Sequence, residues 1–184
     1  MALEPGSLPE SLQTLSASHN LISRFPAEAL DNLKGLAWLF LRGNYLEELP
    51  DYTFKYHKRL DKLDLGENSI QSIPHNVFNN SLTVRDLNLD CNNLKTLPAQ
   101  AFRGLSPGRI YLSMNKLEGM DDRTFVGVSH SLEFLDLEQN YLQKIPKALS
   151  QLKRLKYLYI PSNKITEVQD DAFESFSGSL RALS

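Results

Sequence analysis

The chain has 184 residues, a formal net charge of -2 at pH 7 and one cysteine, Cys91. This near-neutral charge argues against a nucleic-acid-binding protein, which usually carries a clustered basic face. The longest apolar run, LAWLFL at 36–41, is far shorter than the roughly 20 residues that span a bilayer, so we expect no membrane insertion of this segment. A single cysteine forms no disulfide within the chain and does not identify a compartment.

The most informative feature of the sequence is a repeated pattern. Asparagines mark one phase of it at positions 20, 44, 68, 92, 115, 140 and 163, in steps of 23 to 25 residues. The copies begin near residues 12, 36, 60, 84, 107, 132 and 155, and a partial copy covers 180–184. Two typical copies are LDKLDLGENSIQSIPHNVF from Leu60 and VRDLNLDCNNLKTLPAQAF from Val84. We therefore expect residues 1–184 to form a single repeat domain.

This pattern, L-x-x-L-x-L-x-x-N-x-L followed by an apolar residue, a proline and a later aromatic, resembles the leucine-rich repeat family. Its segments LPDYTF and IPHNVF are similar to the 24-residue type of extracellular proteins, in particular chaoptin-like and acid-labile-subunit-like cell-surface proteins. The resemblance implies an α/β-type solenoid, a leucine-rich repeat arc with a parallel concave β-sheet of about seven strands. The convex side is expected to be irregular, with short 3-10 or helical turns.

Each recurrent residue has a physical role in this arc. Positions 1, 4 and 6 of a repeat, such as Leu60, Leu63 and Leu65, point into the core, and successive strands stack about 4.8 Å apart. The asparagine after each strand closes the turn, and its amide pairs with backbone groups of adjacent turns. Leaving one such buried group unpaired costs about 1–3 kcal/mol. The ladder residues are Asn20, Asn44, Asn68, Asn92, Asn115, Asn140 and Asn163.

The convex side is expected to contain a phenylalanine column, formed by Phe54, Phe78, Phe102, Phe125 and Phe173. In the repeat from 132, Leu149 replaces this phenylalanine, and we expect a short helical turn there. Around it lies a basic run, which is either a solvated surface or a heparin-like docking site. Its members are Lys144, Lys147, Lys153, Arg154 and Lys156. Pro107, in place of a leading leucine, predicts a local bend or a shortened strand.

Function is expected to reside in the outward strand positions 3, 5 and 7, which form the concave face and are called the sheet face below. This face has an aromatic pair, an acidic middle and an aromatic C-terminal part. Contact hot spots are rich in Trp, Tyr and Arg, which favours binding of a protein or peptide. Isolated exposed aromatics are nevertheless ordinary on strands. The candidate contact residues are Trp38, Phe40, Arg42, Asp64, Asp86, Asp90, Arg109, Tyr111, Phe134, Asp136, Tyr157 and Tyr159.

Motifs for other chemistry are missing from the sequence. The four histidines lie in different repeats or phases, and no pair has metal-ligand spacing. Asp64, Asp86 and Asp90 suit Ca²⁺ by ligand type, but strand spacing separates them and a solvated acidic patch is favoured. There is no phosphate loop and no nucleophile elbow, so we expect neither catalysis nor a cofactor. The triplet NNS makes Asn79 a candidate glycosylation site on the convex side.

Three functional interpretations remain open. The favoured one is a non-catalytic recognition module of a cell-surface or secreted receptor or adhesion protein, with extracellular localisation implied by the family resemblance. The second is a structural scaffold that self-associates through the sheet face or its ends. The third is an intracellular signalling adaptor, to which Cys91 and the lack of a signal peptide point. The resemblance implies disulfide-bonded caps in surface proteins, so the partial copies at both ends predict an uncapped fragment.

Overall fold

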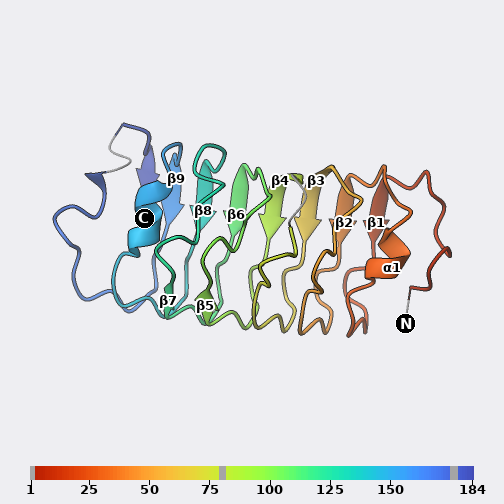
Figure 1. Cartoon of the computed structure of the whole chain (residues 1–184). Helices are drawn as coiled ribbons and strands as arrows, with labels where there is room; N and C mark the ends of the chain where they lie inside the picture. The colour runs from red at the N-terminus through yellow and green to blue at the C-terminus, as the bar shows by residue number, and fades with distance from the viewer. Residues whose placement is uncertain (1–2, 79–81, 175–177) are drawn as a thin grey trace.

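The structure, a computed structural model, describes residues 3–78, 82–174 and 178–184. Each repeat contributes one strand to a parallel sheet that runs along the molecule (Figure 1). In sheet order the strands are β1 (Thr14–Ser16), β2 (Trp38–Phe40), β3 (Arg59–Asp64), β4 (Thr83–Asn88), β6 (Arg109–Tyr111), β8 (Phe134–Asp136), β9 (Tyr157–Tyr159) and β10 (Ala182–Leu183). Sheet order follows chain order, so the chain is a solenoid of stacked turns and the expected fold class is confirmed.

Consecutive strands pair in the same register, so equivalent positions form straight columns across the sheet. Position 3 of one repeat lies beside position 3 of the next, as Trp38 lies beside Lys62. The leucine at position 4 is fully buried, as at Leu63. Leu183 pairs with Leu158, which is the phase expected for the partial copy at 180–184. A slip of one residue would turn every such leucine toward water, so the alternation fixes the register.

The repeat that begins at Pro107 keeps this register with a short strand. β6 has three residues, whereas the preceding β4 has six. Pro107 is buried and has no N–H to donate, so backbone pairing resumes at Gly108, whose N–H donates to the carbonyl of Arg85 at 3.0 Å. Asp86 then lies beside Arg109 without a break. The strand is therefore shortened relative to its neighbour, although β1, β2, β8 and β9 have the same length.

The asparagine ladder connects neighbouring repeats. Asn92 donates from Nδ2 to three backbone carbonyls at 3.0–3.2 Å, one of which is Leu65 in the preceding repeat. Its Oδ1 accepts the N–H of Ile70 at 2.9 Å. The asparagines of the other interior repeats make the same bonds. Asn20, in the first repeat, donates to two carbonyls of its own turn.

The residue before each ladder asparagine has a left-handed backbone. Six of these residues are not glycine, and their φ angles lie between 50° and 57°: His19, Glu67, Cys91, Met114, Gln139 and Ser162. This conformation costs roughly 1–2 kcal/mol for a residue with a Cβ atom. It is retained because the same turn aligns backbone N–H groups with the next repeat, as from Cys91 to the carbonyl of Ser113 at 2.9 Å. The sequence pattern did not predict this feature.

The side of the solenoid away from the main sheet has little regular structure, as expected. It contains α1 (Ala27–Leu30), a 3-10 helix η1 (Lys147–Gln151) and a two-stranded sheet of β5 (Thr96–Leu97) and β7 (Gly119–Met120), at the lower edge of Figure 1. The short helical turn expected around Leu149 is η1, and this leucine is fully buried.

The phenylalanine column consists of stacked pairs. Phe54 and Phe78 stack with ring centroids 5.9 Å apart, and Phe102 and Phe125 with centroids 5.7 Å apart. All four are almost completely buried. Phe173 packs against the same core but is only partly buried. Large apolar rings therefore fill the space between the sheet and the irregular side in the middle of the molecule.

Candidate functional site

The register places the predicted contact residues on one face of the sheet. Trp38, Lys62, Asp86, Arg109, Phe134 and Tyr157 occupy consecutive strands at position 3. Phe40, Asp64, Asn88, Tyr111, Asp136 and Tyr159 do the same at position 5. The exposed fraction is 39% for Trp38 and 37% for Tyr157, so both side chains point outward as predicted.

Four aromatic side chains from three consecutive strands meet on this face and form what we call the aromatic cluster. Phe134 on β8 lies at its centre, with ring centroids 5.0 Å from Tyr111, 5.4 Å from Tyr159 and 6.4 Å from Tyr157. Tilted aromatic pairs at such distances contribute about 0.5–1.5 kcal/mol beyond their area burial. The rings are therefore held against one another rather than exposed singly.

A shallow hollow adjoins the aromatic cluster. It has a volume of about 480 Å³ and is lined by the four rings, by polar side chains on β4 and β6, and by Glu133, which directly precedes β8. Asp86 lies within it, 3.7 Å from the guanidinium of Arg109, and its Oδ1 has no hydrogen-bond partner among the described residues. A partner side chain that supplied a donor here would satisfy this oxygen.

Trp38 and Phe40 on β2 form a separate aromatic pair. The polar strands β3 and β4 lie between them and the aromatic cluster. Lys62 places its ammonium 5.7 Å from the centroid of the Phe40 ring, which is within cation–π range. The six aromatic side chains thus divide into two groups on one face.

The acidic middle of the sheet face contains an ion cluster centred on Arg42. Arg42 reaches Asp90 at 2.8 Å and Glu67 at 2.9 Å, and its guanidinium lies 3.7 Å from Asp64. These carboxylates hold the pKa of Arg42 above its usual range. The sequence analysis included Arg42 among the contact residues but did not predict that it pairs with carboxylates of the two following repeats.

Gly66 makes this cluster geometrically feasible. It occupies position 7 between Arg42 and Asp90 in the adjacent repeats. A Cβ atom added to Gly66 would lie 2.1 Å from Asp90 Oδ1 and 2.4 Å from Arg42 Nη1. The Arg42 side chain therefore crosses directly over the glycine. Sequence reasoning did not identify this residue, although glycine at an otherwise polar strand position was a signal.

The polar residues at position 5 also have a structural role. Asp64, Asn88 and Asp136 each accept, through Oδ1, the N–H of the residue two positions later, at 3.2, 2.8 and 2.9 Å. These bonds close the end of the strand as Asx turns do. The exposed fraction of Asp64 is 7%, so its predicted display on the sheet face is wrong. Asp136 keeps partial exposure.

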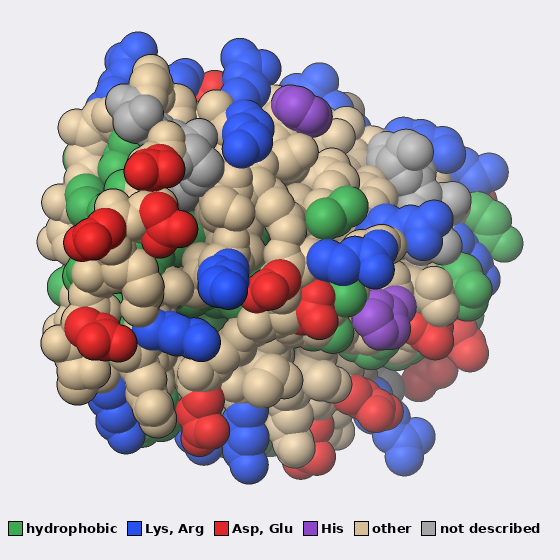
Figure 2. Space-filling model, turned by 60° about the vertical axis from the view of Figure 1, so that its left-hand side comes forward, with side chains coloured by type: hydrophobic (Ala, Val, Ile, Leu, Met, Phe, Trp, Pro, Cys, Tyr) green, Lys and Arg blue, Asp and Glu red, His purple; other side chains and the backbone are tan. Residues whose placement is uncertain are grey.

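Charge is distributed unevenly across the sheet. Basic residues dominate where the strands begin. We count the five positions that end at position 3 of each repeat copy, the partial copy included. They carry ten Lys and Arg against four Asp and Glu. Positions 5 to 8 carry five Asp and Glu against one cation, Arg42. Lys and Arg side chains gather along the upper margin in Figure 2, where the strands begin in Figure 1. The sheet face therefore has a basic edge where the strands begin and an acidic edge where they end.

Three of the five cations in the predicted basic run contact other groups of the chain. Lys156 pairs with Glu133 at 2.8 Å on the sheet, and this ammonium, foremost, holds the pKa of Glu133 below its usual range. Lys153 and Arg154 donate to backbone carbonyls at 2.9 and 3.4 Å. Lys147 lies in η1. Heparin-like docking at this run stays a prediction.

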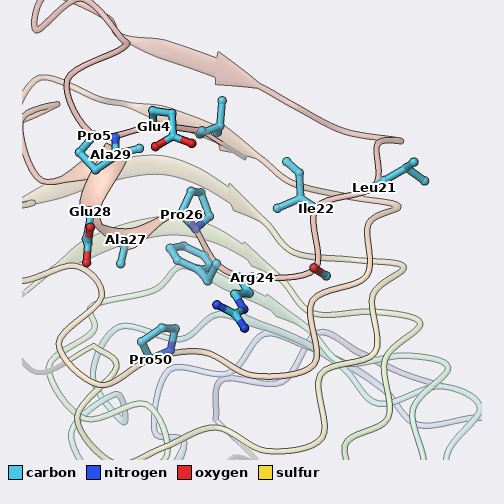
Figure 3. Close-up of a pocket in the computed structure, with 13 residues that line it drawn as sticks. Glu4, Pro5, Leu21, Ile22, Arg24, Pro26, Ala27, Glu28, Ala29 and Pro50 are labelled. Atoms are coloured by element: carbon cyan, nitrogen blue, oxygen red, sulfur yellow. The ribbon is translucent and has the colours of Figure 1, made fainter. Parts of the chain in front are cut away.

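Figure 3 shows a second hollow at the N-terminal end, away from the strands. Its walls are the segment of Glu4 and Pro5, the loop from Leu21 to Pro26, the start of α1, and Pro50 of the next repeat. Glu4, Arg24 and Glu28 are its charged residues, and no pair of them forms an ion pair among the described residues. This hollow therefore lacks the convergent polar groups that typify a catalytic site.

Two titratable groups elsewhere are shifted by burial. Burial raises the pKa of the Cys91 thiol, and the neighbouring Asp90 carboxylate adds to this; Sγ lies 3.5 Å from the sulfur of Met114. A thiol with a raised pKa is a poor nucleophile. His57 is 1% exposed and packs edge-on against Phe54, and burial lowers its pKa.

Three further sequence-based expectations concern glycosylation, metal binding and membrane insertion. Asn79, the candidate glycosylation site, lies outside the described residues. Among residues 3–78, 82–174 and 178–184, no three His, Cys, Asp or Glu side chains are grouped so as to hold a metal ion. In this part of the chain no helix has the length and apolar character to cross a membrane.

The parallel sheet, the stacked turns and the asparagine ladder define a solenoid repeat protein with one outward-facing sheet surface. The family model described as leucine rich repeat matches residues 36–84, 58–107 and 109–165. The chain therefore belongs to the leucine-rich repeat family.

Comparison with known proteins agrees with this family assignment. The chain is 31% identical over 174 residues to lumican of Rattus norvegicus, covering 93% of this chain and 49% of lumican. It is 39% identical over 145 residues to fibromodulin of Oryctolagus cuniculus, covering 77% of this chain and 94% of that sequence. A solved TLR13–ssRNA13 complex matches with a TM-score of 0.67 and 26% identity over 93% of this chain and 29% of that chain.

The relatives differ from this chain in length. The chain spans about half the length of the lumican sequences that it matches. Lumican and fibromodulin are extracellular, non-enzymatic proteins. The family thus includes extracellular relatives of this chain.

Proposed function

We propose that this chain is a non-catalytic recognition domain of a secreted or cell-surface protein, and that its sheet face binds a protein or peptide. The aromatic cluster is the observation that carries the proposal. Four rings from three strands meet on the side of the sheet that faces away from the core, beside a hollow of about 480 Å³. Tyr and Trp are enriched among the residues that dominate protein contacts.

The rigidity of the sheet supports a binding role. Backbone pairing with both neighbouring strands fixes β8, and the rings contact one another before any partner arrives. Side chains that are already ordered lose less conformational entropy on binding, so more of the contact energy appears as affinity. The same argument favours recognition over an incidental display of aromatic residues.

The spacing of the two aromatic groups sets the size of the partner segment. Five strand steps separate β2 from β9 in the sheet. At the usual inter-strand spacing this corresponds to about 24 Å. An extended segment of about seven residues spans that distance, so a short peptide or one edge of a folded domain reaches both groups.

A matched pair of variants tests this proposal. The sheet-face variant changes Tyr111, Tyr157 and Tyr159 to alanine. The control variant changes three exposed tyrosines outside the sheet, Tyr45, Tyr56 and Tyr141, to alanine. Both are compared with the wild-type chain in capture from extracellular extract, with and without nuclease, after circular dichroism and melting show equal folding.

We expect the sheet-face variant to lose a protein that the wild type and the control variant both retain. Equal loss in both variants would refute the assignment of the site. Loss of capture on nuclease treatment would mean that RNA or DNA, rather than a protein, is the ligand. Capture of only a second copy of the chain would replace recognition of another protein by self-association.

A further inference from the structure

We infer that the sheet face selects one arginine side chain of its partner, and that the guanidinium binds the Asp136 carboxylate between the rings of Tyr111 and Tyr159. This inference rests on the proposed function and names the chemical group that the face recognises. Strands β6, β8 and β9 supply the residues of this proposed site, which is called the arginine cradle below.

Strand register surrounds Asp136 with aromatic rings. Tyr111, Asp136 and Tyr159 are direct neighbours at position 5 of three adjacent strands. Such neighbours have Cβ atoms about 4.5–5.5 Å apart. Phe134 precedes Asp136 by two residues on the same strand face, and its ring contacts both tyrosines. The register therefore places three aromatic residues around Asp136, and Glu138 follows it by two residues.

The carboxylates of the cradle have no counter-charge. Among the described residues, no ion pair includes Asp136 or Glu138, whereas Arg42 and Arg109 are engaged with other carboxylates. Burial, foremost, raises the pKa of Asp136, and the neighbouring carboxylates of Glu138 and Asp90 raise it further. A cation brought by a partner would relieve this repulsion, and it would meet the acidic edge of the sheet.

Hydrogen-bonding capacity remains on Asp136 for such a cation. Its Oδ1 accepts the N–H of Glu138 at 2.9 Å, and the hydroxyl of Ser113 also donates to the carboxylate. An ionised carboxylate offers about four acceptor positions, so roughly two stay open. Two acceptors suit the paired N–H groups of a guanidinium.

The aromatic walls favour arginine over lysine. A guanidinium is planar, stacks on aromatic faces and is more weakly hydrated than an ammonium, so it loses less on entering a partly buried site. Lysine would place a compact, strongly hydrated charge against the same rings. The cradle is thus selective by shape as well as by charge.

The chain itself supplies a variant that leaves the fold intact. Asn88 occupies the position equivalent to Asp136 two strands away and accepts the N–H of Asp90 at 2.8 Å. Asp136→Asn therefore keeps the turn bond and removes only the charge. The matched control is Asp64→Asn, at the same strand position, because that carboxylate lies beside Arg42 and contacts no aromatic cluster.

The experiment is a titration of the ¹⁵N-labelled chain, followed by NMR, with three small probes: N-acetyl-arginine methylamide, the citrulline analogue as neutral isostere, and the lysine analogue. We expect the arginine probe to shift the amide of Glu138 and the signals of Tyr111 and Tyr159. Asp136→Asn should weaken its binding by about fivefold or more, the scale of a lost charge-assisted hydrogen bond. Asp64→Asn should leave the affinity unchanged.

Several outcomes would overturn the cradle. These are equal shifts with the citrulline probe, tighter binding of the lysine probe, or an arginine affinity that Asp136→Asn does not reduce. The titration uses no partner protein, so it separates the two proposals. If no probe shifts the NMR signals but a protein is captured specifically, the cradle is refuted and the proposed function stands. If the arginine probe binds specifically but no protein is captured, arginine binding at Asp136 stands and recognition of a protein is refuted.

Discussion

Replacement of one interior ladder asparagine tests how the repeats are held together. In Asn92→Ala the three carbonyls that lose the Nδ2 donor each keep another, because they also accept bonds from a neighbouring asparagine or backbone N–H. The N–H of Ile70, which is fully buried, loses its acceptor. The orphaned N–H contributes roughly 2 kcal/mol and the lost bonds about 1 kcal/mol, so unfolding should become about 3 kcal/mol easier.

Asn20→Ala is the internal control for this variant. Asn20 is exposed and donates to carbonyls of its own turn, so its loss should cost at most about 1 kcal/mol. Thermal melting followed by circular dichroism measures both variants. For a chain of this size, 3 kcal/mol corresponds to a Tm lower by roughly 6–12 °C. Equal Tm values for the two variants would refute the assignment of the ladder as the inter-repeat connection.

Three further predictions concern the core and the ion cluster. Gly66→Ala should displace Arg42 and lower stability by about 1–2 kcal/mol, whereas Gly35→Ala, which meets no atom within 4 Å, should have almost no effect; equal melting temperatures would contradict this. Burial lowers the pKa of His57, so its contribution to stability is complete above the unfolded pKa near 6.5 and is lost as pH falls below it. Melting curves at pH 7 and pH 5 should therefore show a smaller loss in His57→Leu than in the wild type, and parallel losses would exclude the mechanism. Phe102→Ala should lower the free energy of unfolding by about 3–5 kcal/mol in urea titrations, and a cost under about 1 kcal/mol would show that the stacked pair is unimportant.

Much of the sheet face was predictable because each repeat carries its own strand signal. The alternation of leucine with polar residues assigns Trp38 and Tyr157 to the outside before any contact is known, and their exposure agrees. The same motif phase aligns position 5 of one copy with position 5 of the next although the repeat length varies, and this is how Tyr111 and Tyr159 come to flank Asp136. The outward orientation of these side chains and their alignment across the sheet both follow from the repeat pattern alone.

The sequence alone therefore determined the repeat boundaries, the strand register, the asparagine ladder and the columns of outward residues, since all of these follow from a local pattern repeated every 23 to 25 residues. Only the tertiary structure decided which charges neutralise one another. Arg42 bonds to Asp90, 48 residues later, by crossing Gly66, and it lies over Asp64, whereas no ion pair among the described residues includes Asp136. Side-chain reach across two repeats depends on rotamers and on the size of the residue between, and a periodic pattern encodes neither.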